Sequence, residues 1–356
     1  MTRTDKLRSK LKEKGIDALL VTSELNQRYL CGYPFTDGVL LITPARAIMV
    51  TDFRYYEEAQ KMAFPEFEIT MPEMRLAFIT EALKDEDVRV LGYENETLSC
   101  ADFKRYSEKL SDFTFAAIDD MLETIREIKD ENELQLMAKA QSIADAALSN
   151  LLQMIHPNMT EIDVALELEF QMRRGGAENV SFETIAVSGD ASALPHGKPR
   201  NVKLQKGFLT MDFGALYGGY CSDMTRTVSI GRADAEMKRL YNTVLKAQLA
   251  GLESVRPGAD CADCDRVARD IIDGTKGFAG CFGHSLGHGV GLFIHESPRL
   301  SKAGKGTLLV PGHVVTVEPG IYVFGKYGCR IEDMVAVTED GYRNFASSTK
   351  ELIELF

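Results

Sequence analysis

The sequence predicts a two-domain α/β (α+β) protein, with a small N-terminal α/β domain over residues 1–125 and a larger C-terminal domain over residues 126–356. Helix and strand patterns alternate along the first part, which is typical of a domain with its own sheet. Along the second part, a unit of two helices and an acid-bearing hairpin occurs twice. We expect this internal repeat to place the two hairpins side by side about a pseudo-twofold axis, so that their acidic side chains converge.

The composition is that of an ordinary globular protein, with 45% hydrophobic and 26% charged residues. The net charge is −12, from 53 acidic and 41 basic residues, which argues against nucleic acid or an anionic membrane as a partner. The charged start is not a secretory signal, and no window approaches the roughly 20 apolar residues that span a bilayer. The seven scattered cysteines favour a reducing, cytoplasmic location over a disulfide framework.

The elements of the first domain follow from the spacing of its apolar residues. This part of the chain contains no histidine, and its acidic residues are spread along exposed faces, so we expect no catalytic chemistry there. The pattern predicts helices over residues 3–14, 53–63 and 99–110 and strands near residues 16–21, 38–43, 46–50 and 88–93.

Local helix signals mark the first copy of the repeat. Asp130, with Glu133 three residues later, forms a capping-box pattern that opens a long helix to about Met154. Thr160 caps a second helix, which ends at the glycine pair beginning with Gly175. Strands and the first acid-bearing hairpin are expected after this helix.

The second copy repeats this order. A helix over residues 233–254 is followed by a proline-containing turn and by a helix that Asp260 caps. Cys261 and Cys264 form a CxxC pair at the start of that helix, but no second pair accompanies them. We therefore expect no zinc or redox role for this pair.

The first acid-bearing hairpin is predicted around a glycine-rich turn between two β-type runs. If the turn is centred between Tyr217 and Gly218, Asp212 lies directly opposite Asp223. Like charges that face each other on neighbouring strands destabilise a sheet, so something must offset their repulsion.

The second hairpin repeats this arrangement, because a turn centred on Gly325 places Glu318 opposite Glu332. A single acid pair of this kind can also lie on a solvated sheet face without a ligand. Two such pairs, on either side of a histidine-rich segment, instead favour divalent cations bound to oxygen ligands.

The histidine-rich segment contains His284, His288 and His295, set among glycines that allow close approach of backbone and ligand. Its spacing is not that of a helical HExxH zinc site. One histidine and four carboxylates suit Mn²⁺ or Co²⁺ and can hold two metal ions about 3.5–4 Å apart. We expect such a pair to activate water for hydrolysis of an amide or phosphoester, with free histidines positioning the carbonyl or carrying protons.

The residues around these candidates form short phrases: SALPHG at 192–197, MDFG at 211–214, SDMTRT at 222–227, GHGVG at 287–291, HE at 295–296, VEPG at 317–320 and RIED at 330–333. Together they resemble the pita-bread metallopeptidases, the family of methionine aminopeptidase, aminopeptidase P and prolidase. The resemblance covers the whole chain, because the first domain is similar to the non-catalytic, creatinase-like domain of aminopeptidase P and prolidase. It implies a pita-bread catalytic domain over residues 126–356.

The resemblance also implies a complete set of ligands for two divalent metal ions per subunit. By this resemblance Asp212 chelates one ion, Asp223 and Glu332 bridge both, and His288 and Glu318 bind the other. We expect Mn²⁺, although Co²⁺, Zn²⁺ and Fe²⁺ tolerate the same ligands.

The remaining roles implied by the resemblance concern catalysis and substrate. Glu318 accepts a proton from the nucleophilic water, His196 shuttles a proton or hydrogen-bonds the substrate, and His295 contacts the scissile carbonyl. His284 and Arg330 match positions typical of the proline-specific branch and are expected to bind substrate.

The activity implied by the resemblance is that of a cytoplasmic Xaa-Pro aminopeptidase, which releases the N-terminal residue from peptides with proline second. A prolidase restricted to Xaa-Pro dipeptides is the alternative within the enzyme class, and a metal-free peptide-binding module is disfavoured by the complete ligand set. Relatives with this architecture are usually homodimers. Cys221 and Cys329 lie close to ligands and are expected to make the enzyme sensitive to oxidation or soft metals.

Overall fold

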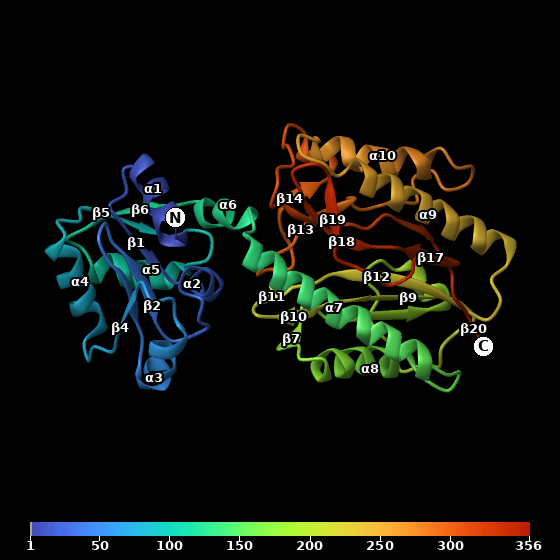
Figure 1. The fold of residues 1–356 in the computed structure, drawn as a ribbon, viewed down its shortest axis with the longest axis horizontal. Helices are drawn as coiled ribbons and strands as arrows, with labels where there is room; N and C mark the ends of the chain where they lie inside the picture. Colours follow the sequence, from blue (N-terminus) through green and yellow to red (C-terminus); the bar gives the residue numbers. More distant parts are fainter. Residues whose placement is uncertain (1) are drawn as a thin grey trace. The chain divides into compact units, whose positions relative to one another are not determined.

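The computed structural model describes residues 2–356, which form two compact units, one up to Arg126 and one from Glu127 onward. Each unit has its own sheets and its own buried core. Within the described residues, every helix is too short or too polar to cross a membrane. Figure 1 shows the elements of both units.

The first unit consists of α1 (Arg3–Glu13), β1 (Ala18–Val21), α2 (Glu24–Cys31), β2 (Val39–Ile42), β3 (Ala47–Val50), α3 (Phe53–Met62), β4 (Phe67–Thr70), α4 (Arg75–Asp85), β5 (Val90–Tyr93), α5 (Cys100–Lys109), β6 (Thr114–Ala117) and α6 (Met121–Glu127). Its sheet has the strand order β4-β3-β2-β1-β5-β6. β1 pairs antiparallel with β2 and parallel with β5, so the sheet is mixed. Strands β1 to β3 are continuous apolar runs and are buried throughout, which indicates that both faces are covered. The predicted small α/β domain is confirmed.

The second unit contains four long helices, α7 (Glu131–Met154), α8 (Glu161–Arg174), α9 (Ala235–Ser254) and α10 (Cys261–Asp273). α7 packs against α8, and α9 packs against α10. The predicted capping boxes at Asp130 and Thr160 are both formed, and Asp260 caps α10. The N-cap residues of α8 and α10 each form an isolated bridge, Thr160 with Lys203 and Asp260 with Leu308, so the two halves repeat even this detail.

The strands of the second unit are β7 (Asn179–Val180), β8 (Ile185–Ser188), β9 (Gly207–Phe213), β10 (Ala215–Tyr217), β11 (Tyr220–Cys221), β12 (Met224–Ile230), β13 (Gly287–Gly289), β14 (Glu296–Leu300), β15 (Val314–Val317), β16 (Gly320–Val323), β17 (Tyr327–Arg330), β18 (Asp333–Val337), β19 (Tyr342–Asn344) and β20 (Glu354–Leu355). The larger sheets have the orders β20-β12-β9-β8 and β14-β13-β15-β18-β19. One core joins α7 and α8 to the first sheet, and the other joins α9 and α10 to the second. In Figure 1, α9 and α10 lie on one side of these strands and α8 lies on the other. The predicted order of two helices followed by an acid-bearing hairpin is present twice.

The first hairpin differs from its predicted register. The turn is centred between Gly218 and Gly219, and Asp212 therefore faces Thr225 instead of Asp223. Both glycines have positive φ, 58° and 84°. A two-residue hairpin turn of type I′ requires positive φ at both central positions. Because Thr225 lies two residues from Asp223, the two aspartates are diagonal neighbours rather than a facing pair.

The second hairpin has its predicted register. β16 and β17 pair around Gly325, whose φ is 71°, and β15 and β18 continue in the same register, so Glu318 faces Glu332. Their backbones nevertheless diverge, because Glu318 N–H donates to Leu286 O (2.8 Å) and Glu332 N–H donates to Thr225 O (3.2 Å). The second of these hydrogen bonds joins the two halves of the repeat.

Candidate active site

One cavity of about 830 Å³ in the second unit brings together every residue that the sequence predicts for the site. α8 contributes apolar residues to its wall, and the acid-bearing strands of both halves contribute polar ones. The predicted residues on this wall are Asp212, Asp223, His288, Glu318 and Glu332 for metal binding and His196, His284, His295 and Arg330 for catalysis or substrate binding.

His288, on β13, presents one ring nitrogen to the acids. Its Nδ1 lies 3.0 Å from Gly289 O, and because a carbonyl can only accept, Nδ1 carries the hydrogen. Nε2 then bears the lone pair, 3.6 Å from Asp223 Oδ2 and 3.5 Å from Glu318 Oε1. Burial lowers the pKa of His288 to about 4, so the ring is neutral at pH 7. A neutral lone pair that faces carboxylate oxygens leaves a place for a cation between them.

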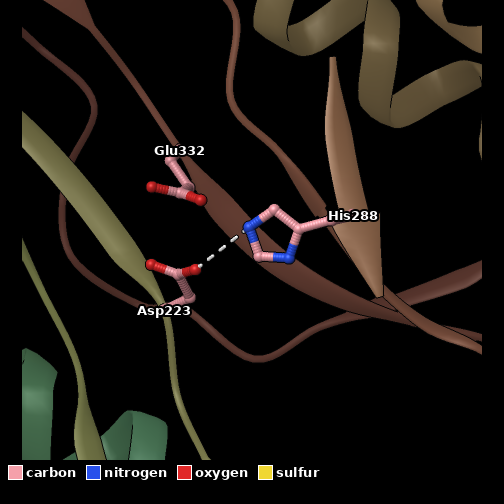
Figure 2. A group of neighbouring side chains, drawn as sticks. All are labelled: Asp223, His288 and Glu332. Carbon is pink, nitrogen blue, oxygen red and sulfur yellow. Dashed lines mark ion pairs between the residues drawn. The ribbon is translucent and has the colours of Figure 1, made fainter. Parts of the chain in front are cut away.

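Three of the candidate ligands form a compact group. Asp223, His288 and Glu332 are buried, and each offers a donor atom within 4.8 Å of the others. Figure 2 shows these side chains pointing toward one another from three separate segments. Asp212 Oδ1 is also buried and has no hydrogen-bond partner among residues 2–356. Imidazole and carboxylate donors that converge in this way fit divalent transition-metal ions.

Burial and mutual repulsion raise the pKa values of three site carboxyls. Burial, followed by the charges of Asp212 and Glu318, raises the pKa of Asp223 well above its usual range. Burial, followed by the charge of Asp223, does the same to the pKa of Glu332. Burial raises the pKa of Glu318 to about 8, although Arg330 opposes this shift. Bound cations would offset the repulsion between these carboxylates.

The metal-free protein is expected to lose stability as the pH rises from about 6.5 to about 8. In this window the Glu318 carboxyl keeps its proton in the folded state, with a pKa of about 8, and has lost it in the unfolded chain, with its usual pKa of 4.5. The folded state thus binds more protons, so raising the pH removes stability.

Buried histidines act in the opposite sense, but only at lower pH. The pKa values of His284 and His288 fall from 6.5 to about 4 on burial, so most of their effect on stability arises between about pH 4 and 6.5. Melting temperatures of chelator-treated protein between pH 6.5 and 8 measure the carboxyl effect, and added Mn²⁺ should abolish the decline. A metal-free protein that becomes more stable across this window would contradict the prediction.

Arg330 is 3% exposed, and its guanidinium is hydrogen-bonded within the site. Nη2 donates to Asp212 Oδ2 (2.6 Å), Nε donates to Thr225 Oγ1 (3.0 Å), and Nη1 donates to Tyr322 OH (2.8 Å) and Pro195 O (3.3 Å). These contacts favour a role in holding Asp212 over the predicted contact with substrate.

Two threonines orient the site acids, although neither was among the predicted site residues. Thr225 Oγ1 donates to Glu332 Oε2 (2.6 Å), and Thr316 Oγ1 donates to Glu318 Oε1 (3.1 Å). Strand periodicity carries the signal for both, because Thr225 lies two residues from Asp223 and Thr316 lies two residues from Glu318.

Three further histidines surround the acids. His284 is held by Tyr322, whose hydroxyl lies 2.9 Å from its Nε2. The ring of His295 lies edge-on to that of His288, with centroids 4.5 Å apart. His196 is exposed on the cavity wall. Burial lowers the pKa values of His284 and His295, so both are neutral at pH 7.

A buried ion pair holds the segment that carries His295. Lys129 Nζ lies 3.0 Å from Glu296 Oε2, and these side chains are 1% and 7% exposed. Glu296 Oε1 accepts a hydrogen bond from Phe293 N–H (3.1 Å), which ties the turn before β14 to the same carboxylate. Arg299, four residues after His295, lines the cavity and was not among the predicted residues. Every second residue of a strand lies on the same face, so the sequence could have placed Arg299 on the same side of β14 as His295.

The two cysteines beside the site have buried thiols. Cys221 and Cys329 are buried, and burial raises the pKa of each thiol to about 12. Since the thiolate is the reactive form, these values oppose the oxidation sensitivity that their position suggested. Cys261 and Cys264 are buried in the core beside α9, in agreement with a packing role.

Comparison with known proteins supports both domains. Residues 135–339 match the metallopeptidase family M24, and residues 3–128 match the creatinase/prolidase N-terminal domain. The solved structure of the Xaa-Pro dipeptidase from Bacillus anthracis is 42% identical, with a TM-score of 0.94 and coverage of 99% of both chains. That of the X-Pro aminopeptidase from Thermotoga maritima MSB8 is 35% identical, with a TM-score of 0.92 and coverage of 98% of this chain and 100% of that one. The uncharacterized peptidase YqhT of Bacillus subtilis (strain 168) is 40% identical over 99% of this chain and 100% of its own length.

Proposed function

Because the chain belongs to the metallopeptidase family M24, whose members are metal-dependent hydrolases, we propose that it cleaves the Xaa-Pro bond of proline-containing peptides. The main support for the proposal is that the lone pair of His288 Nε2 faces the carboxylates of Asp223 and Glu318 inside a buried cluster of acids. At 3.5–3.6 Å these atoms are too far apart for a good hydrogen bond, and a cation fits between them. Two ions bound there would supply Lewis acidity and a nucleophilic water at neutral pH.

The protein's own residues would hold these ions and handle the proton. Asp212, Asp223, His288, Glu318 and Glu332 would bind the two ions, as the donor set allows. Thr316 holds Glu318 Oε1, which leaves Oε2 to receive a proton from the attacking water.

Two histidines would handle the substrate carbonyl and the leaving group. Neutral His295 can donate a hydrogen bond to the scissile carbonyl, because its pKa is lowered by burial. His196, exposed on the same wall, can accept a proton and pass it to the leaving proline nitrogen.

The length of the substrate decides between two activities. A cavity of about 830 Å³ lies in the upper part of the range that holds drug-sized ligands, which favours peptides longer than a dipeptide and therefore the aminopeptidase. Arg299 on the same wall favours the prolidase alternative, because its guanidinium suits the C-terminal carboxylate of an Xaa-Pro dipeptide.

The test offers Leu-Pro and Leu-Pro-Gly-Gly to the Mn²⁺-loaded protein and to an Arg299→Gln variant. We expect leucine release from both peptides, with the variant losing activity on the dipeptide more than on the tetrapeptide. Release from the dipeptide alone would overturn the aminopeptidase in favour of the prolidase. Release from neither, by a protein that binds Mn²⁺, would overturn Xaa-Pro cleavage.

Replacing His196 is expected to lower kcat while leaving the metal in place. His196→Ala removes a proton-transfer group, for which a loss of about 10²-fold or more in kcat is typical. Elemental analysis should find the wild-type content of Mn²⁺, because His196 is not among the proposed ligands. His156→Ala is the matched control, since His156 is exposed and lies outside this cavity. Loss of both ions from His196→Ala would contradict the assigned role.

Mn²⁺ as the bound metal, a homodimeric state and a cytoplasmic location stay predictions. Elemental analysis of the protein as isolated measures the first. Light scattering of the protein in solution measures the second.

A further inference from the structure

Two charged residues of the site phrases SDMTRT and RIED are not used by the proposed mechanism, and they pair with each other. Arg226 Nη2 lies 2.7 Å from Asp333 Oδ1, and the two side chains are 3% and 0% exposed. Each follows a residue whose side chain belongs to the site, Thr225 in one phrase and Glu332 in the other. Successive residues of a strand point to opposite faces, so this ion pair lies behind the strands that carry the site acids.

The guanidinium of Arg226 also holds the backbones of both strands. Nη1 donates to Thr225 O (2.9 Å), within β12, and to Glu332 O (2.6 Å), directly before β18. β12 and β18 belong to different sheets, one from each half of the repeat. At this point Glu332 N–H also donates to Thr225 O (3.2 Å). One side chain therefore fixes the spacing of the two segments across which Asp223 and Glu332 meet.

We propose that Arg226 is a positioning residue, which sets the separation of Asp223 and Glu332 from behind and thereby makes the site able to hold two metal ions at once. This inference rests on the proposed function. Asp223 and Glu332 are the carboxylates proposed to contact both ions. A change in their spacing should therefore lower the affinity for the second ion more than the affinity for the first. Groups that orient metal ligands from outside typically contribute about 10–100-fold to metal affinity.

Arg226 also contacts a segment outside the site, and these contacts would matter if Arg226 only stabilised the fold. Its Nη2 donates to Ser348 O (2.8 Å) and its Nε donates to Thr349 O (3.0 Å), which anchors the segment before β20. Asp145 anchors the same segment independently, by accepting hydrogen bonds from Ser347 N–H (3.0 Å) and Ser348 N–H (2.9 Å). Asp145→Asn thus loosens this segment while leaving the contacts to Thr225 and Glu332 in place.

The experiment measures stepwise Mn²⁺ affinity by competition with a chelator, and counts spin-coupled Mn²⁺ pairs by electron paramagnetic resonance. Arg226→Lys keeps a charge beside Asp333 but lacks the fork that reaches two carbonyls at once. We expect affinity for the second ion to fall by about 10–100-fold and that for the first to change by less than about threefold. Asp145→Asn should bind both ions like the wild type even where its melting temperature falls.

A second variant separates spacing from stability. Arg226→Met removes the guanidinium without leaving the Asp333 carboxylate unpaired, because Asp333 Oδ2 still accepts hydrogen bonds from Lys350 Nζ (2.6 Å) and Asn344 Nδ2 (2.8 Å). We expect this variant to fold and still to bind the second ion weakly. Wild-type affinity for the second ion in both Arg226 variants, or a loss in Asp145→Asn equal to that in Arg226→Lys, would overturn the inference. Failure of the wild-type protein itself to bind Mn²⁺ would instead overturn the proposed function.

Discussion

Asp223→Asn is expected to abolish turnover and to prevent binding of two metal ions. The substitution removes a carboxylate proposed to bridge both ions, and an amide oxygen carries no charge to hold them. Metal ions contribute several kcal/mol to hydrolysis of this kind, so the loss in kcat should be on the order of 10³-fold or greater. Peptide-release assays and elemental analysis measure the two effects.

The same substitution should stabilise the metal-free protein. Burial and the neighbouring acids raise the pKa of Asp223 well above its usual range, which means that its charge is unfavourable in the folded state without metal. Asparagine removes that charge at nearly constant volume, so the metal-free variant should melt at a higher temperature than metal-free wild type near pH 8. Asp190→Asn is the matched control, because the Asp190 side chain is 67% exposed. Two bound ions in Asp223→Asn would contradict the assignment of this residue.

Arg330→Met is expected to destabilise the protein strongly and to lower activity. It removes the buried cation that donates to Asp212 and Tyr322, and loss of one partner from a buried ion pair typically costs about 3–5 kcal/mol. Unfolding of the metal-free variant in denaturant measures this cost. Bound Mn²⁺ should recover part of it, because the ions take over the neutralisation of the acids.

Controls distinguish this role from a contact with substrate. If Arg330 holds Asp212, Arg330→Lys should lower both the stability of the metal-free protein and its metal affinity. A variant that changes only KM, with stability and metal affinity as in the wild type, would support the substrate role instead. Arg266→Met should leave both properties unchanged, because the Arg266 side chain is 62% exposed and its ion pair with Asp263 lies on the surface of α10.

The two hairpins show how far turn residues alone determine register. In the second hairpin, Gly325 is the residue with positive φ at the turn, and its predicted position was correct. In the first hairpin, Gly218 and Gly219 both adopt positive φ, and a turn placed one residue earlier shifted the partner of Asp212 by two residues. A shift of two residues keeps each side chain on its face, so the acids still converged in spite of the wrong register.

The family, the metal-dependent hydrolase activity and the two-domain α/β fold were predicted from the sequence and are confirmed. The candidate residues, all but His284 carried by short phrases scattered over the second half of the chain, all line one cavity. Strand periodicity also held the signal for Thr225, Thr316 and Arg299, since each lies an even number of residues from a predicted site residue on the same strand or at its end.

The sequence by itself determined the local elements, because caps, glycine turns and apolar periodicity depend on residues only a few positions apart. It also predicted side chains that the structure brings together in one cavity. Only the tertiary structure decided which hydrogen-bond donors of these side chains are available to a substrate, because contacts between distant segments use some of them. Arg330 reaches Asp212 across 118 residues, and Arg226 reaches Glu332 across 106. A guanidinium has five N–H donors, and those used to hold the site together are no longer available to a substrate.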